Sequence, residues 1–307
     1  MNICFTGVGS IALRHIRNLK ELYGTDIKIT AVRSGKGKKL SDDEARLIDK
    51  VIYGFDEMEP FYDAVFITNP TSEHYETLRK TLDKSDSFFV EKPAFVTGDE
   101  DCSAFDKPGK KFYIACPLRY SGVIEYIKKE IDFSDVFSIR CISSSYLPEW
   151  RQGIDYRNTY SASKELGGGV SIDLIHEWDY LSYLLGFPVK VKSLISKKSD
   201  LDIDSDDIAV YIAEYPGLIA ELHLDYFGRT AMRKIELFLK NDTITCDLIS
   251  QKIYYNVEGK TIELNESRDD YQKKELEHFM NIATGKIKSD NDLEYACKVL
   301  RLARGVL

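Results

Sequence analysis

The sequence contains no long run of apolar residues. A helix that spans a membrane needs about 20 consecutive, mostly apolar residues, and no stretch of the chain approaches that length. The chain also enters a strand-like segment at Asn2, with no signal peptide in front of it. We therefore expect a cytoplasmic protein that has no membrane partner.

An excess of positive charge is also missing, because the formal net charge is -8. Proteins that bind nucleic acid as their main partner carry clustered Lys and Arg on a basic face. The balance of charge therefore argues against nucleic acid, although it still allows a local basic pocket.

Cysteine and histidine patterns that hold metals are absent. The sequence has no C-x-x-C pair and no Cys/His cluster with the spacing of a zinc site. We therefore expect no metal, and we interpret the cysteines as buried thiols without chemistry. The six cysteines are Cys4, Cys102, Cys116, Cys141, Cys246 and Cys297.

What the sequence does contain is the composition of a globular protein of two domains. The 307 residues, 43% hydrophobic and 30% charged, are too many for one ordinary core. Residues 1–120 alternate β-rich runs with amphipathic helical ones, which predicts a parallel α/β sheet of the Rossmann type. The expected strands are 2–6, 27–33, 51–53, 64–68, 87–91 and 111–116.

Residues 121–307 have a different pattern, which predicts an α+β substrate-binding and oligomerisation domain. A helix is expected over 170–185, and short turns then separate closely spaced β-rich runs, as in a mostly antiparallel open sheet. Two helices, near 270–284 and 291–304, should close the chain. The expected strands are 189–196, 208–215, 218–226, 234–239, 243–248 and 252–257.

A phosphate-binding turn follows the first strand. The segment Gly7-Val8-Gly9-Ser10-Ile11-Ala12 fits G-x-G-x-x-A and opens the first helix. In such a turn the first glycine permits the tight bend, the second lets the backbone approach a pyrophosphate, and the small last residue allows the helix to pack on the strand. The alternative is a glycine turn without a ligand, which the βαβ context disfavours. We therefore expect a nicotinamide dinucleotide here.

The end of the second strand lacks the carboxylate that usually binds the ribose 2′-hydroxyl. Arg33 and Ser34 stand there instead, and Lys36, Lys38 and Lys39 follow. A cation and a hydroxyl suit a 2′-phosphate, so we predict NADP in preference to NAD. The lysines alone fit a solvated loop equally well.

Further along, the chain resembles the Gfo/Idh/MocA oxidoreductases, the family of glucose-fructose oxidoreductase and inositol 2-dehydrogenase. The resemblance covers nearly the whole chain and keeps the family's motif order. It rests on Gly7-Val8-Gly9-Ser10-Ile11-Ala12, Thr68-Asn69-Pro70 with His74, Glu91-Lys92-Pro93, Leu118-Arg119-Tyr120, and Gly167-Gly168-Gly169-Val170-Ser171-Ile172-Asp173 with His176.

The resemblance implies that Lys92 contacts the substrate hydroxyl and the nicotinamide ribose and assists proton transfer. Lys92 ends the fifth strand, where open α/β sheets bind their ligands. A surface lysine before a turn is the alternative. The remaining cofactor contacts are expected from Thr68, Asn69, Pro70, His74 and Glu91, although His74 fits an ordinary helix start equally well.

The expected helix 170–185 places Asp173, His176, Glu177 and Tyr180 on one face. Oxidation of an alcohol carbon needs a base for the hydroxyl proton, and His176 suits that task because its ordinary pKa lies near neutrality. An exposed face without chemistry is the alternative. In many family members the histidine lies four positions after the aspartate, whereas here His176 lies three positions after Asp173. The carboxylate that partners His176 is therefore either Asp173 or Glu177.

The run 173–180 ends in His-Glu-x-Asp-Tyr. In this it resembles a subgroup of the family whose genes accompany bacterial surface-polysaccharide and nonulosonic-acid pathways. Trp150, Arg151, Tyr156 and Arg157 also resemble that subgroup and suit an anionic or nucleotide-linked sugar. An ordinary surface loop fits them equally well. Glu177, Tyr180, Arg119 and Tyr120 complete the expected substrate contacts, the last two at the domain junction.

Together these features predict an NAD(P)-dependent dehydrogenase or reductase that acts on a hydroxyl or keto carbon of a sugar, sugar acid or nucleotide sugar. The alternative is a catalytically inactive, NADP-binding regulatory or accessory protein on the same fold. The family resemblance also implies a homodimer or homotetramer packed through the C-terminal sheet.

Overall fold

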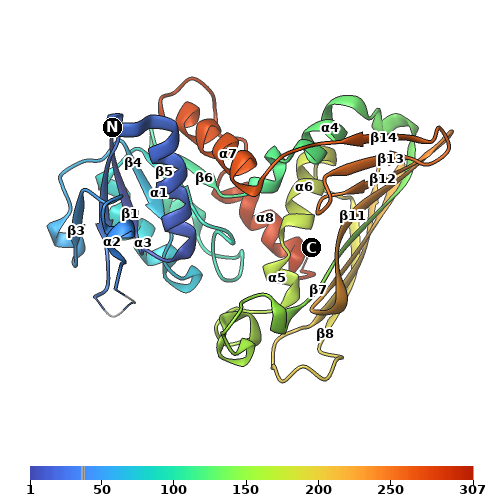
Figure 1. The fold of residues 1–307 in the computed structure, drawn as a ribbon, viewed down its shortest axis with the longest axis horizontal. Helices are drawn as coiled ribbons and strands as arrows, with labels where there is room; N and C mark the ends of the chain where they lie inside the picture. Colours follow the sequence, from blue (N-terminus) through green and yellow to red (C-terminus); the bar gives the residue numbers. More distant parts are fainter. Residues whose placement is uncertain (36, 38, 307) are drawn as a thin grey trace. The chain divides into compact units, whose positions relative to one another are not determined.

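The structure is a computed structural model, and it describes residues 1–35, 37 and 39–306 (Figure 1). Lys36 and Lys38, which belong to the predicted basic loop, lie outside the described residues. The chain divides into a first unit, residues 1–117 and 268–298, and a second unit, residues 118–267 and 299–307. No helix in the described part of the chain is both long and apolar enough to cross a membrane.

The first unit is built on a six-stranded sheet in the order β3-β2-β1-β4-β5-β6, with every pair parallel. This is the strand order of a Rossmann fold, and it confirms the predicted fold class. Each observed strand lies within two residues of its expected bounds. The strands are β1 (Asn2–Thr6), β2 (Lys28–Val32), β3 (Lys50–Ile52), β4 (Ala64–Ile67), β5 (Ser87–Val90) and β6 (Lys111–Ile114).

Both faces of this sheet are covered, as the continuous apolar composition of its strands requires. On one face, Phe66 and Phe89 stack on each other and both meet Phe279 edge-on. On the other face, Val65 and Val90 join a core cluster with Leu78. The helices of this unit are α1 (Ser10–Tyr23), α2 (Asp42–Ala45), α3 (His74–Thr81), α7 (Arg268–Ala283) and the first half of α8 (Leu293–Ala303).

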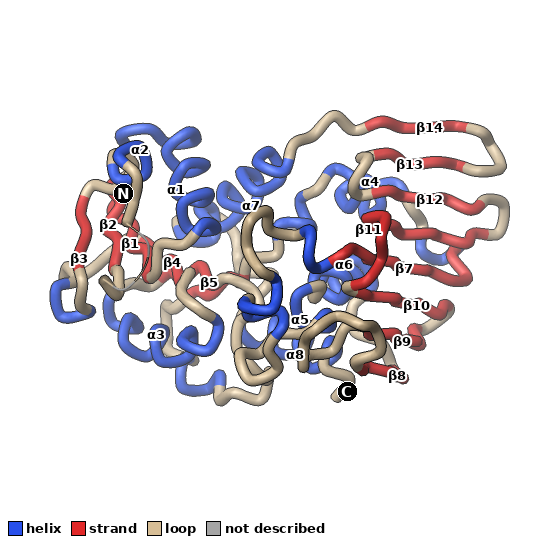
Figure 2. The backbone as a smooth tube through the Cα atoms, turned by 60° about the horizontal axis from the view of Figure 1, so that its bottom comes forward, coloured by secondary structure: helices blue, strands red, loops and turns tan. Residues whose placement is uncertain are grey.

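The predicted domain division differs from this arrangement in two respects. Residues 118–120, which were expected in the first domain, belong to the second unit. Helix α7 and residues 293–298 of α8, which the sequence pattern placed in the second domain, belong to the first unit. The physical reason is packing, because α7 lies along α1 and buries Phe279 on the parallel sheet (Figure 2).

The second unit is built on an eight-stranded, mostly antiparallel sheet in the order β14-β13-β12-β11-β7-β10-β9-β8 (Figure 2). Its one parallel pairing among the described strands joins β10 to β7. The sequence pattern did not predict β7 or β14. The strands are β7 (Val136–Tyr146), β8 (Lys190–Ser196), β9 (Ile208–Tyr215), β10 (Leu218–Asp225), β11 (Phe227–Leu239), β12 (Thr243–Asp247), β13 (Lys252–Tyr255) and β14 (Lys260–Glu263).

One face of this sheet is covered and the other is open. Alternation along β9 buries Ala209, Tyr211 and Ala213, and Tyr211 meets Trp178 edge-on. On the opposite face, Ile212 and other apolar side chains are exposed. The helices of this unit are α4 (Gly122–Glu130), α5 (Val170–Asp173), α6 (His176–Leu185) and the end of α8.

Candidate active site

The predicted phosphate turn follows β1, and its geometry requires glycine. Gly7 adopts a positive φ of 84°, and its N–H donates to the carbonyl of Val32 at the end of β2 (2.9 Å). A Cβ atom on Gly7 would lie 2.8 Å from Cα of Asn69. The absence of a side chain therefore brings the turn and the segment after β4 together.

Gly9 precedes α1 and leaves the start of that helix open. A Cβ atom on Gly9 would meet no described atom within 4 Å. None of the described side chains caps the first turn of α1, and that turn carries no acidic residue. The N–H groups of Ser10, Ile11 and Ala12 therefore remain at the positive end of a helix, which is the arrangement that binds phosphate.

The segment Thr68-Asn69-Pro70 lies beside the turn. The Thr68 hydroxyl donates to the carbonyl of Gly7 (2.8 Å), and the Asn69 side-chain amide donates to the Thr77 hydroxyl (2.8 Å). The Asn69 Oδ1 atom is buried and has no hydrogen-bond partner among the described residues. A buried acceptor of this kind is an incomplete site that a ligand donor would satisfy, so these residues fit a bound dinucleotide.

His74 is placed differently from the expectation that it contacts the cofactor. It is 1% exposed, and its two ring nitrogens face the carbonyls of Asn69 (2.9 Å) and Ala94 (3.0 Å). Burial lowers the pKa of His74. Because the ring is enclosed by backbone, His74 holds the segments after β4 and β5 together.

Arg33 and Ser34 begin the loop after β2. The N–H of Arg33 donates to Ile52 (2.9 Å), and the preceding residue, Val32, accepts the hydrogen bond from Gly7. Arg33 is partly exposed and Ser34 is exposed. The backbone thus brings both residues next to the glycine turn.

Glu91 and Lys92 follow β5 at the carboxyl edge of the sheet. The Glu91 carboxylate lies 2.6 Å from Nε2 of His15 and accepts the backbone N–H of Lys92 (3.2 Å). Burial raises the pKa of Glu91, but the hydrogen bond and charge of His15, together with Lys92, outweigh burial and leave the pKa below its ordinary value. Lys92 is partly exposed, and its peptide bond to Pro93 is cis.

His15 is a residue of this site that the sequence interpretation missed. It is 1% exposed on the inner face of α1, three positions after Ala12 in the stripe that packs on the sheet. A histidine within an apolar stripe needs a polar partner. That need was a signal that a partner, here Glu91, lies beneath the helix.

In the second unit, the predicted helix 170–185 is broken into α5 and α6 at Leu174 and Ile175. The glycines before α5 allow a close approach by Asp206, because a Cβ atom on Gly169 would lie 2.2 Å from its carboxylate. The same carboxylate accepts the N–H of Ser171 (2.9 Å). Asp206 therefore fixes the start of α5, and the sequence interpretation did not identify it.

Asp173 ends α5 and is 6% exposed. Its carboxylate accepts the hydroxyl of Tyr226 (2.6 Å) and that of Tyr160. Burial raises the pKa of Tyr226 well above its ordinary value, and the charge of Asp173 adds to this effect. Because the helix breaks after Asp173, this carboxylate does not continue the face of α6.

His176 begins α6 and is partly exposed, while residues 168–175 and 177–182 around it are buried. Glu177 is 0% exposed, and its carboxylate accepts Nε of Arg233 (2.7 Å). Tyr180 is also 0% exposed. Glu177 and Tyr180, which are expected to contact substrate, are therefore both buried, and Glu177 is paired with Arg233, far along the chain.

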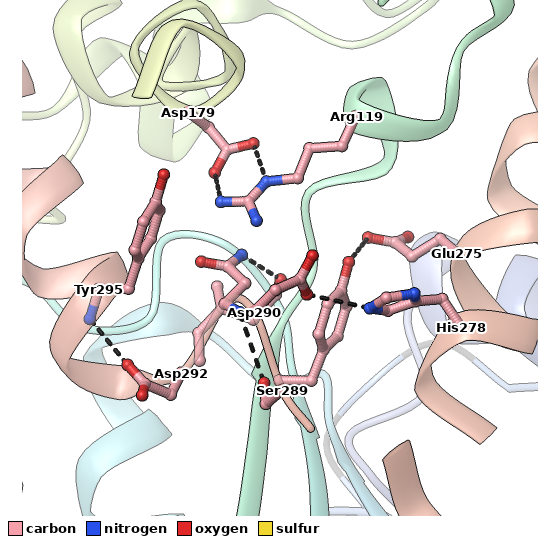
Figure 3. A network of polar contacts seen from close by, with 11 residues as sticks. Arg119, Asp179, Glu275, His278, Ser289, Asp290, Asp292 and Tyr295 are labelled. Atoms are coloured by element: carbon pink, nitrogen blue, oxygen red, sulfur yellow. Dashed lines mark hydrogen bonds and ion pairs between the residues drawn. The ribbon is translucent and has the colours of Figure 1, made fainter. Parts of the chain in front are cut away.

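Arg119, expected among the substrate contacts, forms a buried ion pair in the second unit. Its guanidinium donates to both carboxylate oxygens of Asp179, at 2.8 and 2.5 Å (Figure 3), and the two side chains are 0% and 3% exposed. Tyr120, at the end of the short helix η6 (Pro117–Tyr120), is partly exposed. Arg119 therefore supports α6 from within.

Tyr156, one member of the predicted aromatic and cationic segment, lines a hollow in the second unit. The hollow has a volume of about 450 Å³ and is also lined by Tyr146, Lys198 and Arg229, and the Tyr156 hydroxyl accepts the N–H of Asp202 (3.1 Å). The Arg229 guanidinium lies 3.8 Å above the Tyr146 ring. This mixture of aromatic faces and cations suits a ring that carries negative charge.

The other members of this segment have partners of their own. Trp150 donates Nε1 to the hydroxyl of Ser145 (2.9 Å) and meets Tyr226 edge-on. Arg151 lies over the Tyr160 ring (5.6 Å). The Asp155 carboxylate binds the Arg157 guanidinium (2.6 Å), so a substrate anion would have to compete with it.

No group of three or more His, Cys, Asp or Glu side chains in the described ranges is arranged to hold a metal ion. The candidate residues of the first unit are the glycine turn and Lys92. Those of the second unit are His176 and, separately, the residues that line the aromatic and cationic hollow.

Comparison with known proteins agrees with this chemistry. The chain is 23% identical over 190 residues to the uncharacterized oxidoreductase YrbE of Bacillus subtilis, a match that covers 60% of this chain and 53% of the relative. It is also 29% identical over 136 residues to scyllo-inositol 2-dehydrogenase (NAD(+)) of the same organism. That match covers 42% of this chain and 36% of the relative. The matched segments thus span about half or less of these curated relatives.

A solved structure shares the fold over the whole chain. UDP-N-acetylglucosamine 3-dehydrogenase GnnA from Acidithiobacillus ferrooxidans superposes with a TM-score of 0.79 at 19% identity, covering 100% of this chain and 96% of that one. The family model of the GFO/IDH/MocA C-terminal domain matches residues 127–245. Residues 127–245 therefore match the GFO/IDH/MocA C-terminal domain, and the predicted resemblance to the Gfo/Idh/MocA oxidoreductases is confirmed.

Proposed function

We propose that the protein is an NAD(P)-dependent oxidoreductase that interconverts a CH–OH and a keto carbon on a sugar, sugar acid or nucleotide sugar. One observation carries the proposal. Helix α1 starts without a cap at Gly9, and Gly7, two residues earlier, packs against Asn69, whose buried Oδ1 atom has no partner among the described residues. That combination supports a dinucleotide at the turn.

A bound nicotinamide would accept or donate the hydride, and the residues of this chain would manage the proton. We propose Lys92 of the first unit as one candidate acid or base for the substrate hydroxyl proton, and His176 of the second unit as another, because each side chain is partly exposed. The Glu91 carboxylate positions Lys92 by accepting the backbone N–H of Lys92. Asp173, held by two tyrosine hydroxyls, fixes the end of α5 just before His176.

The substrate class follows from the hollow beside Tyr156. Aromatic faces with Lys198 and Arg229 would recognise an anionic or nucleotide-linked sugar, and Trp150, Arg151, Arg157 and Tyr120 extend that set. The resemblance to a surface-polysaccharide subgroup and the likeness to a UDP-N-acetylglucosamine 3-dehydrogenase support the same class. We place the protein in polysaccharide biosynthesis on this basis.

Arg33 and Ser34 favour NADP as the cofactor, because a guanidinium and a hydroxyl suit a 2′-phosphate. The test is a fluorescence titration with NADPH and with NADH at one fixed ionic strength. Clearly tighter binding of NADPH, with the preference reduced roughly 10-fold in Arg33→Ala, is expected. Tighter NADH binding would overturn the role of Arg33, and binding of neither would overturn the proposed function.

Turnover is tested separately with a panel of sugars, sugar acids and nucleotide sugars. Lys92→Ala should reduce kcat by a factor on the order of 100 or more while cofactor affinity stays within a few-fold. Unchanged turnover would remove Lys92 from the mechanism. A wild-type protein that binds NADP(H) and turns over no member of the panel would favour an inactive accessory protein.

We further propose that the protein is a homodimer or homotetramer assembled through the open face of the eight-stranded sheet. Ile212 and Ile219 are exposed there, and apolar side chains on an open sheet favour association. Sedimentation of the wild type and of Ile212→Lys should show an oligomer and its dissociation. A monomeric wild type would refute this assembly.

A further inference from the structure

Cys102 and Cys297 form a thiol pair within the first unit. Cys102 begins the short helix η5 (Cys102–Phe105), and Cys297 lies on α8. Their Sγ atoms are 3.5 Å apart, although the residues are 195 positions apart in the sequence. A disulfide requires a separation of about 2 Å, so a small local movement would join them.

The loop that carries Cys102 is fixed by hydrogen bonds. The Glu100 carboxylate accepts the N–H groups of Thr97 (2.8 Å) and Gly98 (2.7 Å). The Asp101 carboxylate accepts the N–H of Ser103 (3.0 Å). Because these two carboxylates, which directly precede Cys102, hold the backbone before and after it, the approach of Cys102 to Cys297 is a feature of the folded loop.

The two thiols differ in access. Cys102 is half-buried and lines a hollow of about 950 Å³ in the first unit, whereas Cys297 is 3% exposed. The hydrogen bond with Cys297 lowers the pKa of Cys102 and outweighs burial and the charges of Glu100, Asp101 and Asp292, which raise it. By contrast, burial raises the pKa of Cys4 to about 12. Cys102 is therefore suited to attack a disulfide, and Cys297 is suited to displace the mixed disulfide that forms on Cys102.

The hollow carries a local positive charge in an otherwise acidic protein. Five lysines line it together with three carboxylates, and one of the lysines, Lys110, is paired with Asp86 (2.9 Å). A cationic rim raises the local concentration of anionic reagents. The lysines are Lys107, Lys110, Lys111, Lys286 and Lys288.

We propose that Cys102 and Cys297 are a redox-active dithiol that reacts with small disulfides that carry carboxylates. The Cys102 thiolate attacks one sulfur of the reagent, the reagent's S–S bond breaks, and one small thiol leaves. Cys297 then loses its proton to solvent, attacks the Cys102 sulfur and expels the second thiol. The cysteine pair loses two electrons, and the reagent gains them as two thiols.

Oxidation would join η5 to α8 covalently and close a loop of nearly 200 residues. Such a link restricts the unfolded chain. The oxidised protein should therefore melt on the order of 5 °C above the reduced protein.

The test uses the full reduced chain and glutathione disulfide, followed by alkylation, mass spectrometry and peptide mapping. The expected product has lost the mass of two hydrogen atoms and carries a Cys102–Cys297 link. Cys102→Ser should stay unmodified, and Cys297→Ser should stop at a stable mixed disulfide. Cys116→Ala, which removes another buried thiol of the first unit, should react as the wild type does.

The role of the lysines is tested with cystamine, a cationic disulfide. At low salt the ratio of the glutathione disulfide rate to the cystamine rate should be roughly 3-fold higher than in 1 M salt. A wild-type product that keeps glutathione on Cys102 beside an intact Cys297 thiol would overturn the proposal, as would an unreactive Cys102. Neither readout requires substrate or cofactor.

Discussion

Nε2 of His15 lies 2.6 Å from the Glu91 carboxylate, so the helix that follows the glycine turn is bonded to the residue before Lys92. The side chains are 1% and 14% exposed. His15→Ala removes a partner of a buried carboxylate and should lower the free energy of unfolding by about 2 kcal/mol. Denaturant unfolding at neutral pH measures this loss.

His278 supplies a matched control in the same unit. It lies 2.9 Å from Asp290 (Figure 3), but the side chains are 23% and 39% exposed. Solvent screens such a pair, so His278→Ala should cost less than about 1 kcal/mol. Equal losses in the two variants would contradict a special role for the buried pair.

The His15–Glu91 contact should also be sensitive to acid. The folded-state pKa of Glu91 lies below its ordinary value of 4.5, so its contribution is fully present above pH 4.5 and is lost as the pH falls through the lower, folded-state pKa. In His15→Ala, burial should dominate the pKa of Glu91, because the hydrogen bond and charge of His15 are gone. The variant should therefore lack the acid-induced loss of stability that this contact causes in the wild type. Unfolding measured from pH 7 to pH 3 should therefore show a stability difference that shrinks as the pH falls. A difference that grows in acid would refute this assignment.

The two glycines of the turn should respond differently to alanine. Gly7→Ala combines a positive φ with a Cβ atom 2.8 Å from Asn69, and it should cost about 1–3 kcal/mol of stability as well as cofactor binding. Gly9→Ala projects into open space, so it should fold normally but weaken NADPH binding about 10-fold or more. Thermal melts and fluorescence titration separate the two effects. Undiminished binding in Gly9→Ala would place the phosphates elsewhere.

The buried Arg119–Asp179 pair should matter for stability even if it never contacts substrate. Arg119→Ala leaves a buried carboxylate unpaired and should cost about 3–5 kcal/mol, and Arg119→Lys should recover only part of it because a lysine lacks the two-pronged geometry. Thermal unfolding measures both. The exposed Arg157, paired with Asp155, is the control, and Arg157→Ala should melt as the wild type does. Similar melting of all three variants would contradict the prediction.

Asp173 and Tyr226 should be energetically coupled. Their side chains share a 2.6 Å hydrogen bond inside the second unit, so a cycle of Asp173→Asn, Tyr226→Phe and the double variant should give about 1–2 kcal/mol of coupling. Urea unfolding supplies the values. A coupling near zero would mean that Asp173 is held mainly by Tyr160.

Sequence patterns predicted the first unit well because each of its strands and its glycine turn is marked by a short, continuous stretch of sequence. Alternating β-rich and helical runs identified all six strands of the parallel sheet, and the glycine turn was found by its motif. The second unit was harder. Strand β7 lies between β10 and β11 in the sheet, and no short-range turn signals a strand whose partners come about 80 residues later.

The candidate site shows the same limit. Periodicity placed Glu177 and Tyr180 on one face with His176 and favoured substrate contacts there, yet the structure buries both. The partner of Glu177 is Arg233, 56 residues away, and the partner of Asp179 is Arg119, 60 residues away. A helical pattern records which residues share a face, but it cannot record a distant cation that makes a polar face an interior one.

The chain crosses between its two units at 117/118, 267/268 and 298/299. The last crossing returns a tail to the second unit, where the Tyr211 hydroxyl donates to Ala303 and Gly305 packs against Ser193. A gene segment that encodes only residues 118–267 would therefore lack part of its own interior. Exchange of this unit between relatives, in evolution or by engineering, has to move two separate stretches of sequence together, and residues 299–307 should coevolve with β8 and β9.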